Sequence, residues 1–206
     1  MSIKLYAGQN AFAEIKEQGL SPKRIRLMVG ASGGPKWLML SRLDQYLCEH
    51  FFSQCEQPVS LLGSSVGAWR MSCYAQSDPL TAFKRFEDLY THQRYKGKIT
   101  ADQVTEYADR VLSELFAKSE IENIVNNAKR PLHIVAVRNR RIFNSRHPAM
   151  QGAALLTAAA GNLISPKIVK TVYPRIIIST PGSTSPYTTP QTSIDLTQRN
   201  LKSALL

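Results

Sequence analysis

The residues best suited to chemistry lie in the segment 63–67, Gly-Ser-Ser-Val-Gly, where glycines stand two residues before and after Ser65. A short apolar run, residues 59–62, precedes this segment, and a sequence with helical character follows it. This context predicts a sharp strand-to-helix turn that exposes the serine hydroxyl, because side chains at the two glycine positions would collide with neighbouring chain. We therefore take Ser65 as a candidate nucleophile; the alternative is a glycine-rich turn with an inert serine.

A second glycine-rich segment, residues 30–36, follows an expected first strand over residues 24–29. The carboxyl ends of neighbouring parallel strands meet at one edge of a sheet, so we expect this loop to lie beside Ser65. Backbone N–H groups of Gly33 and Gly34 would then be available to stabilise a developing oxyanion. The alternative is a plain strand-to-helix turn.

A phosphate-binding loop is a further interpretation of the segment that starts at Gly30. That motif requires Gly-x-x-x-x-Gly-Lys-Ser/Thr, and this chain has Pro35 and Trp37 at the sixth and eighth positions. Proline has no N–H to donate to a phosphate, and tryptophan cannot bind Mg²⁺. The sequence therefore argues against a phosphate loop, and Lys36 is left to supply positive charge or to anchor the segment.

An activated serine also needs a base that takes its proton. The chain has four histidines, His50, His92, His133 and His147. In α/β-hydrolases the histidine follows a late strand, so His147, which comes after the apolar run 132–137, fits best. His133 lies inside that run, and we expect it to be a core residue. A Ser-His-Asp esterase stays an alternative, although that fold places several strands before its serine, whereas in this chain the serine follows only the second predicted strand.

The order of the predicted elements is typical of an α/β protein with a mostly parallel sheet flanked by helices. Four apolar segments are expected to form strands: residues 24–29, 59–62, 132–137 and 175–179. Helices are expected over residues 11–18, 37–52, 66–76, 149–164 and 196–206, and further helices are expected to begin near residues 79, 100 and 119. Residues 180–192, rich in Thr, Ser, Pro and Gly, are expected to form a surface loop.

Several residues are expected to mark helix ends. Asn10 is predicted to cap the first helix at its start, and Gly19 is predicted to end it. Two pairs have the spacing of a capping box, Thr100 with Gln103 and Ser119 with Glu122.

The glycine loop at 33–36 and the serine turn at 63–67 together resemble the patatin-like phospholipases. That family has a Gly-Gly-Gly-x-Arg/Lys-Gly oxyanion loop, a Gly-x-Ser-x-Gly serine turn, and a Ser-Asp dyad that uses no histidine. The resemblance implies a three-layer sandwich, hydrolysis of a lipid or other acyl ester by Ser65, and an oxyanion hole formed by Gly33 and Gly34. It implies neither a cofactor nor a metal. Residues 61–70 carry the resemblance best; residues 132–138 and 200–205 carry it more weakly.

The chain departs from the family's oxyanion loop at three positions. Ser32 stands in place of the first glycine, Ala31 in place of a frequent acidic residue, and Trp37 in place of the closing glycine. Gly33 and Gly34, the two residues most needed as donors, are present.

The family's catalytic aspartate lies in an Asp-Gly-Gly or Asp-Gly-Ala motif far downstream of the serine. In this chain no aspartate is followed by Gly or Ala. Family members continue, after a segment similar to residues 200–206, into the part that carries this aspartate. We therefore expect residues 1–206 to be a single patatin-like α/β domain without its C-terminal part, with the base beyond Leu206 and little activity of its own.

The composition is that of one globular domain, with 206 residues, 43% hydrophobic and 20% charged. No apolar run has the length of a membrane span, and the N-terminus has no signal-peptide core, so we expect a cytoplasmic protein. The three cysteines lack metal-ligand spacing and are expected to be reduced thiols.

The net charge of +11 allows a second interpretation. A basic protein can bind nucleic acid or the surface of an anionic membrane, so a non-catalytic binding module of either kind is an alternative to the enzyme. The densest basic cluster, residues 138–141, is too short to define a nucleic-acid groove, and we expect no specific nucleic acid. Peripheral contact with an anionic membrane is compatible with the predicted acyl-ester substrate.

Overall fold

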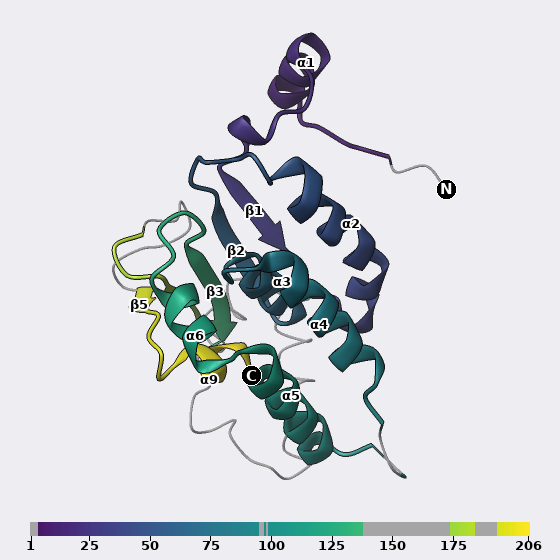
Figure 1. Ribbon diagram of the computed structural model, residues 1–206, viewed down its shortest axis with the longest axis vertical. Helices are drawn as coiled ribbons and strands as arrows, with labels where there is room; N and C mark the ends of the chain where they lie inside the picture. Colours follow the sequence, from purple (N-terminus) through teal and green to yellow (C-terminus); the bar gives the residue numbers. More distant parts are fainter. Residues whose placement is uncertain (1–3, 95–96, 98, 138–173, 184–192) are drawn as a thin grey trace, which may run out of the picture.

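The sheet has five strands in the order β1-β2-β3-β4-β5 in the computed structural model, which describes residues 4–94, 97, 99–137, 174–183 and 193–206 (Figure 1). Strands β1, β2 and β3 run parallel, β4 is antiparallel to β3, and β5 is parallel to β4. The strands are β1 Leu27–Gly30, β2 Ser60–Ser64, β3 Leu132–Val137, β4 Arg175–Ser179 and β5 Ser193–Asp195. The predicted α/β class with a mostly parallel sheet is thus confirmed.

Three strands differ from the sequence-based expectation, of which β2 differs least: it was predicted over 59–62 and covers Ser60–Ser64. The predicted first strand began at Arg24, but residues Pro22–Arg24 form a single 3₁₀ turn, η1, and β1 starts at Leu27. Strand β5 was not predicted, because it is only three residues long and lies in a segment without alternating apolar residues.

The helices agree with the expected order. They are α1 Gln9–Gln18, α2 Ser41–Tyr46, α3 Val66–Tyr74, α4 Pro79–Thr91, α5 Ala101–Leu115, α6 Lys118–Val125 and α9 Leu201–Leu205. The helix predicted over 37–52 is a helical segment of three types: the 3₁₀ helix η2 (Gly34–Leu40), then α2, then the π-helix η3 (Leu47–Phe51). The helix predicted over 149–164 lies outside the described residues.

Helix ends follow the predicted capping only in part. The Thr100–Gln103 capping box is present at the start of α5, and Gly19 ends α1 with a φ of 76°. The Ser119–Glu122 box was wrong: α6 begins at Lys118, so Ser119 already has a position inside the first turn and cannot cap it. The cap of α1 is Gly8 rather than Asn10.

The C-terminal segment also differs from the expectation. A helix was predicted over 196–206, but residues 197–200 form a turn, and α9 covers only Leu201–Leu205. The turn is closed by two reciprocal hydrogen bonds, from Thr197 N to Asn200 Oδ1 (2.7 Å) and from Asn200 N to Thr197 Oγ1 (3.2 Å). Short polar side chains thus satisfy backbone groups before the helix starts. Of the predicted loop 180–192, residues 180–183 are described and form a turn.

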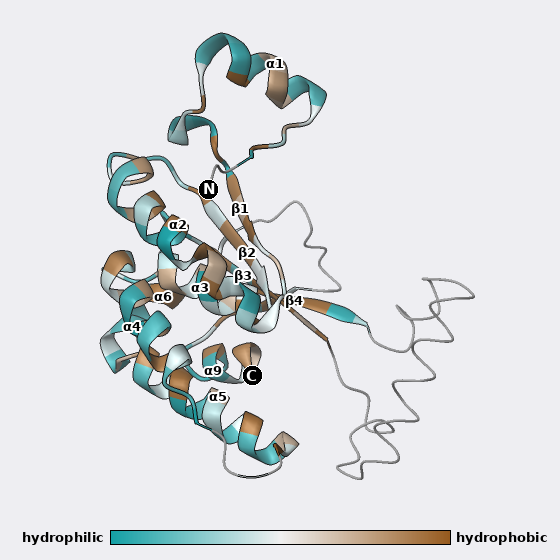
Figure 2. Cartoon of the chain, turned by 90° about the vertical axis from the view of Figure 1, so that its right-hand side faces the viewer, coloured by the Kyte–Doolittle hydropathy of each residue, from teal (hydrophilic) through white to brown (hydrophobic). Residues whose placement is uncertain are grey.

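Helices α2, α3, α4 and α6 lie on one face of the sheet, α5 and α9 lie on the same side beyond the carboxyl ends of β1–β3, and α1 stands beyond the start of β1 (Figure 2). The core lies between the sheet and this helical layer. Leu61, Leu132 and Ile134 of the sheet belong to one buried cluster with residues of α3 and with Phe83 and Phe86 of α4, and α3 lies between the sheet and α4. Burial of this apolar surface fixes α3 on the carboxyl halves of β1 and β2, which positions the serine turn.

Candidate active site

Ser65 has an unusual backbone conformation between β2 and α3. Its φ is 53° and its ψ is −135°, and it is the one non-glycine residue with a positive φ in the part of the chain that the structure describes. Its carbonyl accepts hydrogen bonds from Ala68 N (2.7 Å) and Trp69 N (3.3 Å), so α3 begins directly behind it. The serine makes no side-chain capping bond and is exposed. Side chains in such strained conformations cluster at functional sites.

Three glycines allow the chain to cross itself tightly at this turn. A Cβ built at Gly67 would lie 2.1 Å from the carbonyl oxygen of Gly30, and one built at Gly63 would lie 2.4 Å from the Cα of Ala68. Any side chain would therefore force backbone atoms apart. The tight turn predicted for residues 63–67 is present, and its glycines are required by close packing of α3 on β1 and β2.

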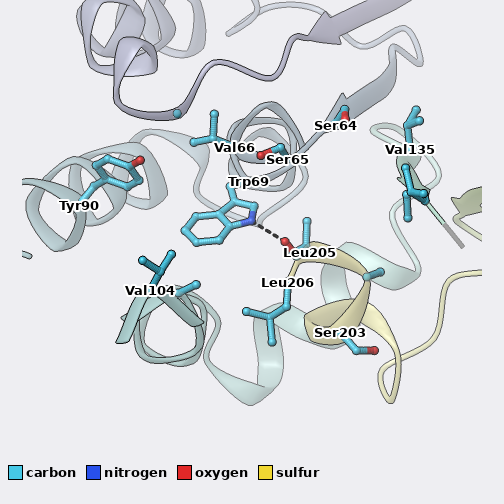
Figure 3. A pocket seen from close by; sticks show the side chains of 15 residues that line it. Ser64, Ser65, Val66, Trp69, Tyr90, Val104, Val135, Ser203, Leu205 and Leu206 are labelled. Atoms are coloured by element: carbon cyan, nitrogen blue, oxygen red, sulfur yellow. Dashed lines mark hydrogen bonds between the residues drawn. The ribbon is translucent and has the colours of Figure 1, made fainter. Parts of the chain in front are cut away.

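Ser65 lies at the edge of a cavity of about 570 Å³ (Figure 3). The serine turn and α3 form one side of it, and α4, α5, β3 and α9 form the others. Its walls include Trp69, Tyr90, Val104, Val135, Leu205 and Leu206. Among the described residues that line it, none has a charged side chain, so the cavity suits an uncharged and largely apolar group.

The two glycines predicted as oxyanion donors differ in position. Gly34, with a φ of 52°, lines the same cavity as Ser65, whereas Gly33 precedes it and is not among the lining residues. Gly33 is held in the loop by its carbonyl, which accepts a hydrogen bond from Lys36 N (3.3 Å).

The sequence reasoning missed a third donor, the backbone N–H of Val66. Val66 lines the cavity at the first position of α3, where N–H groups have no partner within the helix. The N-terminus of a helix also attracts negative charge. The signal was available, because the residue after the serine supplies an oxyanion donor in other enzymes with this turn.

None of the described histidines or carboxylates lines the cavity. His50 is exposed in η3, and His92 is exposed at the end of α4, with its Nδ1 3.1 Å from Asp88 Oδ1. His147 lies outside the described residues.

His133 is fully buried in β3, as expected for a core residue. Its Nδ1 lies 2.9 Å from Ser179 Oγ, while its Nε2 has no hydrogen-bond partner. Burial lowers the pKa of its imidazole, so the ring is neutral near pH 7. His133 pairs with Leu62 of β2, which lies three residues before Ser65. His133 therefore lies further into the sheet than the edge that carries Ser65.

Helix α9 forms one wall of the cavity. It is held there by contacts that sequence patterns do not reveal. The indole Nε1 of Trp69 donates a hydrogen bond to the carbonyl oxygen of Leu205 (2.9 Å; Figure 3). The ammonium of Lys202 lies 2.7 Å from Asp109 Oδ1 on α5. Both contacts join residues far apart in the sequence, and together they attach α9 to the helix that carries the serine and to α5.

Comparison of the chain with protein-family models, with curated proteins and with solved structures gives no match. Among the helices that the structure describes, none is long and apolar enough to cross a bilayer. The geometry of Ser65 and its cavity therefore carries the functional interpretation.

Proposed function

We propose that this protein is a serine acyl hydrolase of the lipase or phospholipase type, with Ser65 as its nucleophile. The observation that carries the proposal is the conformation of Ser65: a strained serine at the N-terminus of a helix, exposed beside an uncharged cavity. An inert serine in a glycine-rich turn would have no reason to hold a φ of 53°, which costs of order 1–3 kcal/mol.

In the proposed reaction, Ser65 Oγ attacks the carbonyl carbon of an ester while its proton passes to a base. Negative charge then develops on the carbonyl oxygen and is stabilised by backbone N–H groups of Gly34 and Val66, which line the cavity beside Ser65. Collapse of this intermediate breaks the ester bond, and the protonated base returns a proton to the leaving alcohol. Water then attacks the acyl-serine and gives a proton to the base; as the acyl–oxygen bond breaks, the base returns that proton to Ser65 Oγ and the acid is released.

We assign the base to an aspartate beyond Leu206, as in the Ser-Asp dyad of the patatin-like phospholipases that the serine turn and glycine loop resemble. Two observations support this choice. None of the described residues around the cavity is a histidine or a carboxylate. Leu205 and Leu206 themselves line the cavity, so a chain that continued past Leu206 would start beside Ser65. This mechanism requires neither a metal nor a cofactor.

The substrate in this proposal is a lipid or other acyl ester whose apolar part occupies the cavity. The apolar walls favour an aliphatic group over a charged one, since a charged group would lose its hydration without gaining a partner. The net charge of +11 would also favour approach to an anionic membrane surface, where such esters occur.

A fluorophosphonate probe tests the proposal on the gene product that contains residues 1–206 together with any sequence that follows Leu206. We expect the wild-type protein to be labelled and Ser65→Ala to be unlabelled. Ser53→Ala is the matched control, because Ser53 is exposed in the turn after η3 and does not line the cavity. Labelling that survives Ser65→Ala would rule out Ser65 as the nucleophile.

A further inference from the structure

A buried ion pair joins the helical segment that follows the glycine loop to the helix that carries the serine. Arg70 of α3 donates two hydrogen bonds to Asp44 of α2, from Nε to Oδ2 (2.8 Å) and from Nη2 to Oδ1 (2.7 Å). Two parallel bonds of this kind fix direction as well as distance. Neither residue belongs to the cavity.

The pair is almost completely withdrawn from solvent. Asp44 is 1% exposed and Arg70 is 9% exposed. Tyr74, one turn further along α3, donates a third hydrogen bond from its hydroxyl to Asp44 Oδ1 (3.0 Å). Burial, together with the Asp44 carboxylate, raises the pKa of Tyr74 far above its usual range, so the phenol keeps its proton and remains a donor.

The two partners lie close in sequence to the two halves of the proposed site. Gly34 begins η2, and α2 follows η2 without a break, so Asp44 lies in the same continuous helical segment as Gly34. Arg70 lies little more than one turn of α3 beyond Ser65. The ion pair therefore links the helical segment after the loop donors to the helix that follows the serine, in addition to the packing of α3 on β1 and β2.

A second polar contact holds the same helix from another direction. Glu87 of α4 accepts hydrogen bonds from Ser41 Oγ (2.7 Å) and from Gln45 Nε2 (2.7 Å), both on α2. This contact joins α2 to α4 and does not involve α3. It offers a matched control, because its loss weakens the anchoring of α2 without separating the glycine loop from the serine helix directly.

We propose that Asp44 and Arg70 are positioning residues for the reaction at Ser65: their buried pair sets the distance between the oxyanion donors and the nucleophile. A buried ion pair is often no more stabilising than apolar residues of similar volume, so stability alone gives weak grounds for its presence. The directional geometry of the pair is better suited to holding α2 and α3 in one fixed relative position. Small displacements of a reacting group can lower the rate of a reaction by about 100-fold. This inference rests on the proposed function.

The experiment separates positioning from stability by replacing the whole polar group with apolar residues, in the triple variant Asp44→Leu, Arg70→Met and Tyr74→Phe. Hydrolysis of p-nitrophenyl butyrate by the full-length protein is measured with the unfolding midpoint and with amide exchange of residues 31–36. We expect a midpoint similar to that of the wild type, faster exchange in the loop, and a kcat lowered by about 100-fold with KM unchanged.

Two further variants keep the test decisive if the triple variant folds poorly. Arg70→Lys keeps the positive charge but loses the bidentate hydrogen bonds to Asp44. We expect this variant to fold, with a kcat between those of the wild type and the triple variant. Glu87→Gln is expected to lower the unfolding midpoint while kcat stays within about threefold of the wild-type value.

The outcomes distinguish this inference from the function on which it rests. A wild-type protein without Ser65-dependent turnover removes the proposed function and the positioning role with it. An active wild type accompanied by an equally active triple variant or Arg70→Lys variant removes the positioning role alone. An equal loss of kcat in Glu87→Gln would show that general anchoring of α2, rather than its pairing with α3, controls the rate.

Discussion

The indole nitrogen of Trp69 lies 2.9 Å from the carbonyl oxygen of Leu205, so the helix that carries Ser65 is hydrogen-bonded to the last helix of the chain. Trp69 follows Ser65 by one turn of α3, on the same side of the helix, and both residues line the cavity. The cavity wall made by α9 is therefore attached directly to the serine helix.

Trp69→Phe tests this attachment. The substitution keeps an aromatic ring but removes the donor, which costs about 1 kcal/mol and leaves the Leu205 carbonyl without its partner. We expect faster hydrogen exchange at the amides of α9. Trp37→Phe is the control, because Trp37 Nε1 is buried without a hydrogen-bond partner, so the substitution removes no bond. Unchanged exchange in Trp69→Phe would mean that α9 is held by other contacts, such as that between Lys202 and Asp109.

Gly67→Ala is expected to disrupt the crossing of α3 over β1. The added methyl group would lie 2.1 Å from the carbonyl oxygen of Gly30, and backbone atoms cannot move aside as a side chain can. We expect a loss of about 1–3 kcal/mol or more in the free energy of unfolding, measured by urea denaturation. At Gly8 an added methyl group meets no atom within 4 Å, so Gly8→Ala is expected to lose only the better N-cap of α1, which costs less than about 1 kcal/mol. Equal effects at both positions would contradict the close contact.

Burial of His133 predicts a stability that falls in mild acid. Its pKa is lowered in the folded protein, so between the unfolded value of about 6.5 and the lower folded value the unfolded chain binds more protons. The contribution is complete above about pH 6.5 and is lost as the pH falls towards the folded pKa, by at most about 1.4 kcal/mol per pH unit. Urea unfolding of the wild type and of His133→Gln across this range checks the prediction, and the variant should show a smaller slope. Identical slopes would assign the pH dependence to other groups.

The position of the proposed base predicts a difference between two lengths of the protein. An unassisted serine is a weak nucleophile, so residues 1–206 alone should hydrolyse p-nitrophenyl butyrate far more slowly than a gene product with an Asp-Gly motif after Leu206. Strong turnover by the 206-residue chain would instead place a base within it. His147→Ala would then be the first substitution to make.

The parts of the site that follow from local sequence were predictable. The serine turn at residues 63–67 and the strand 132–137 depend on neighbouring residues, because glycine spacing and a continuous apolar run restrict the backbone directly. The capping box of Thr100 is equally local. Where more than one residue can precede the first turn of a helix, the cap was predicted wrongly. At Asn10 and Ser119 the helix begins one or more residues earlier than the sequence suggests.

The parts that depend on contacts between distant residues were not predictable. Asp44 and Arg70 each look like an ordinary helix-surface charge in the sequence, and only the packing of α2 on α3 buries them together. The bond from Trp69 to Leu205 joins residues 136 positions apart. The antiparallel pairing of β4 with β3 likewise joins segments far apart in the sequence and does not follow from the composition of either strand.

The backbone conformation of Ser65 also implies that the proposed chemistry lowers the stability of the protein. Glycine would adopt a φ of 53° without the steric cost that serine bears there, so Ser65→Gly could fold more tightly than the wild type while losing the hydroxyl. Random mutation and selection for thermostability alone would therefore tend to remove this serine. A search for more stable variants should hold position 65 fixed and look for its gains elsewhere, for example at the buried and unpaired Nε2 of His133.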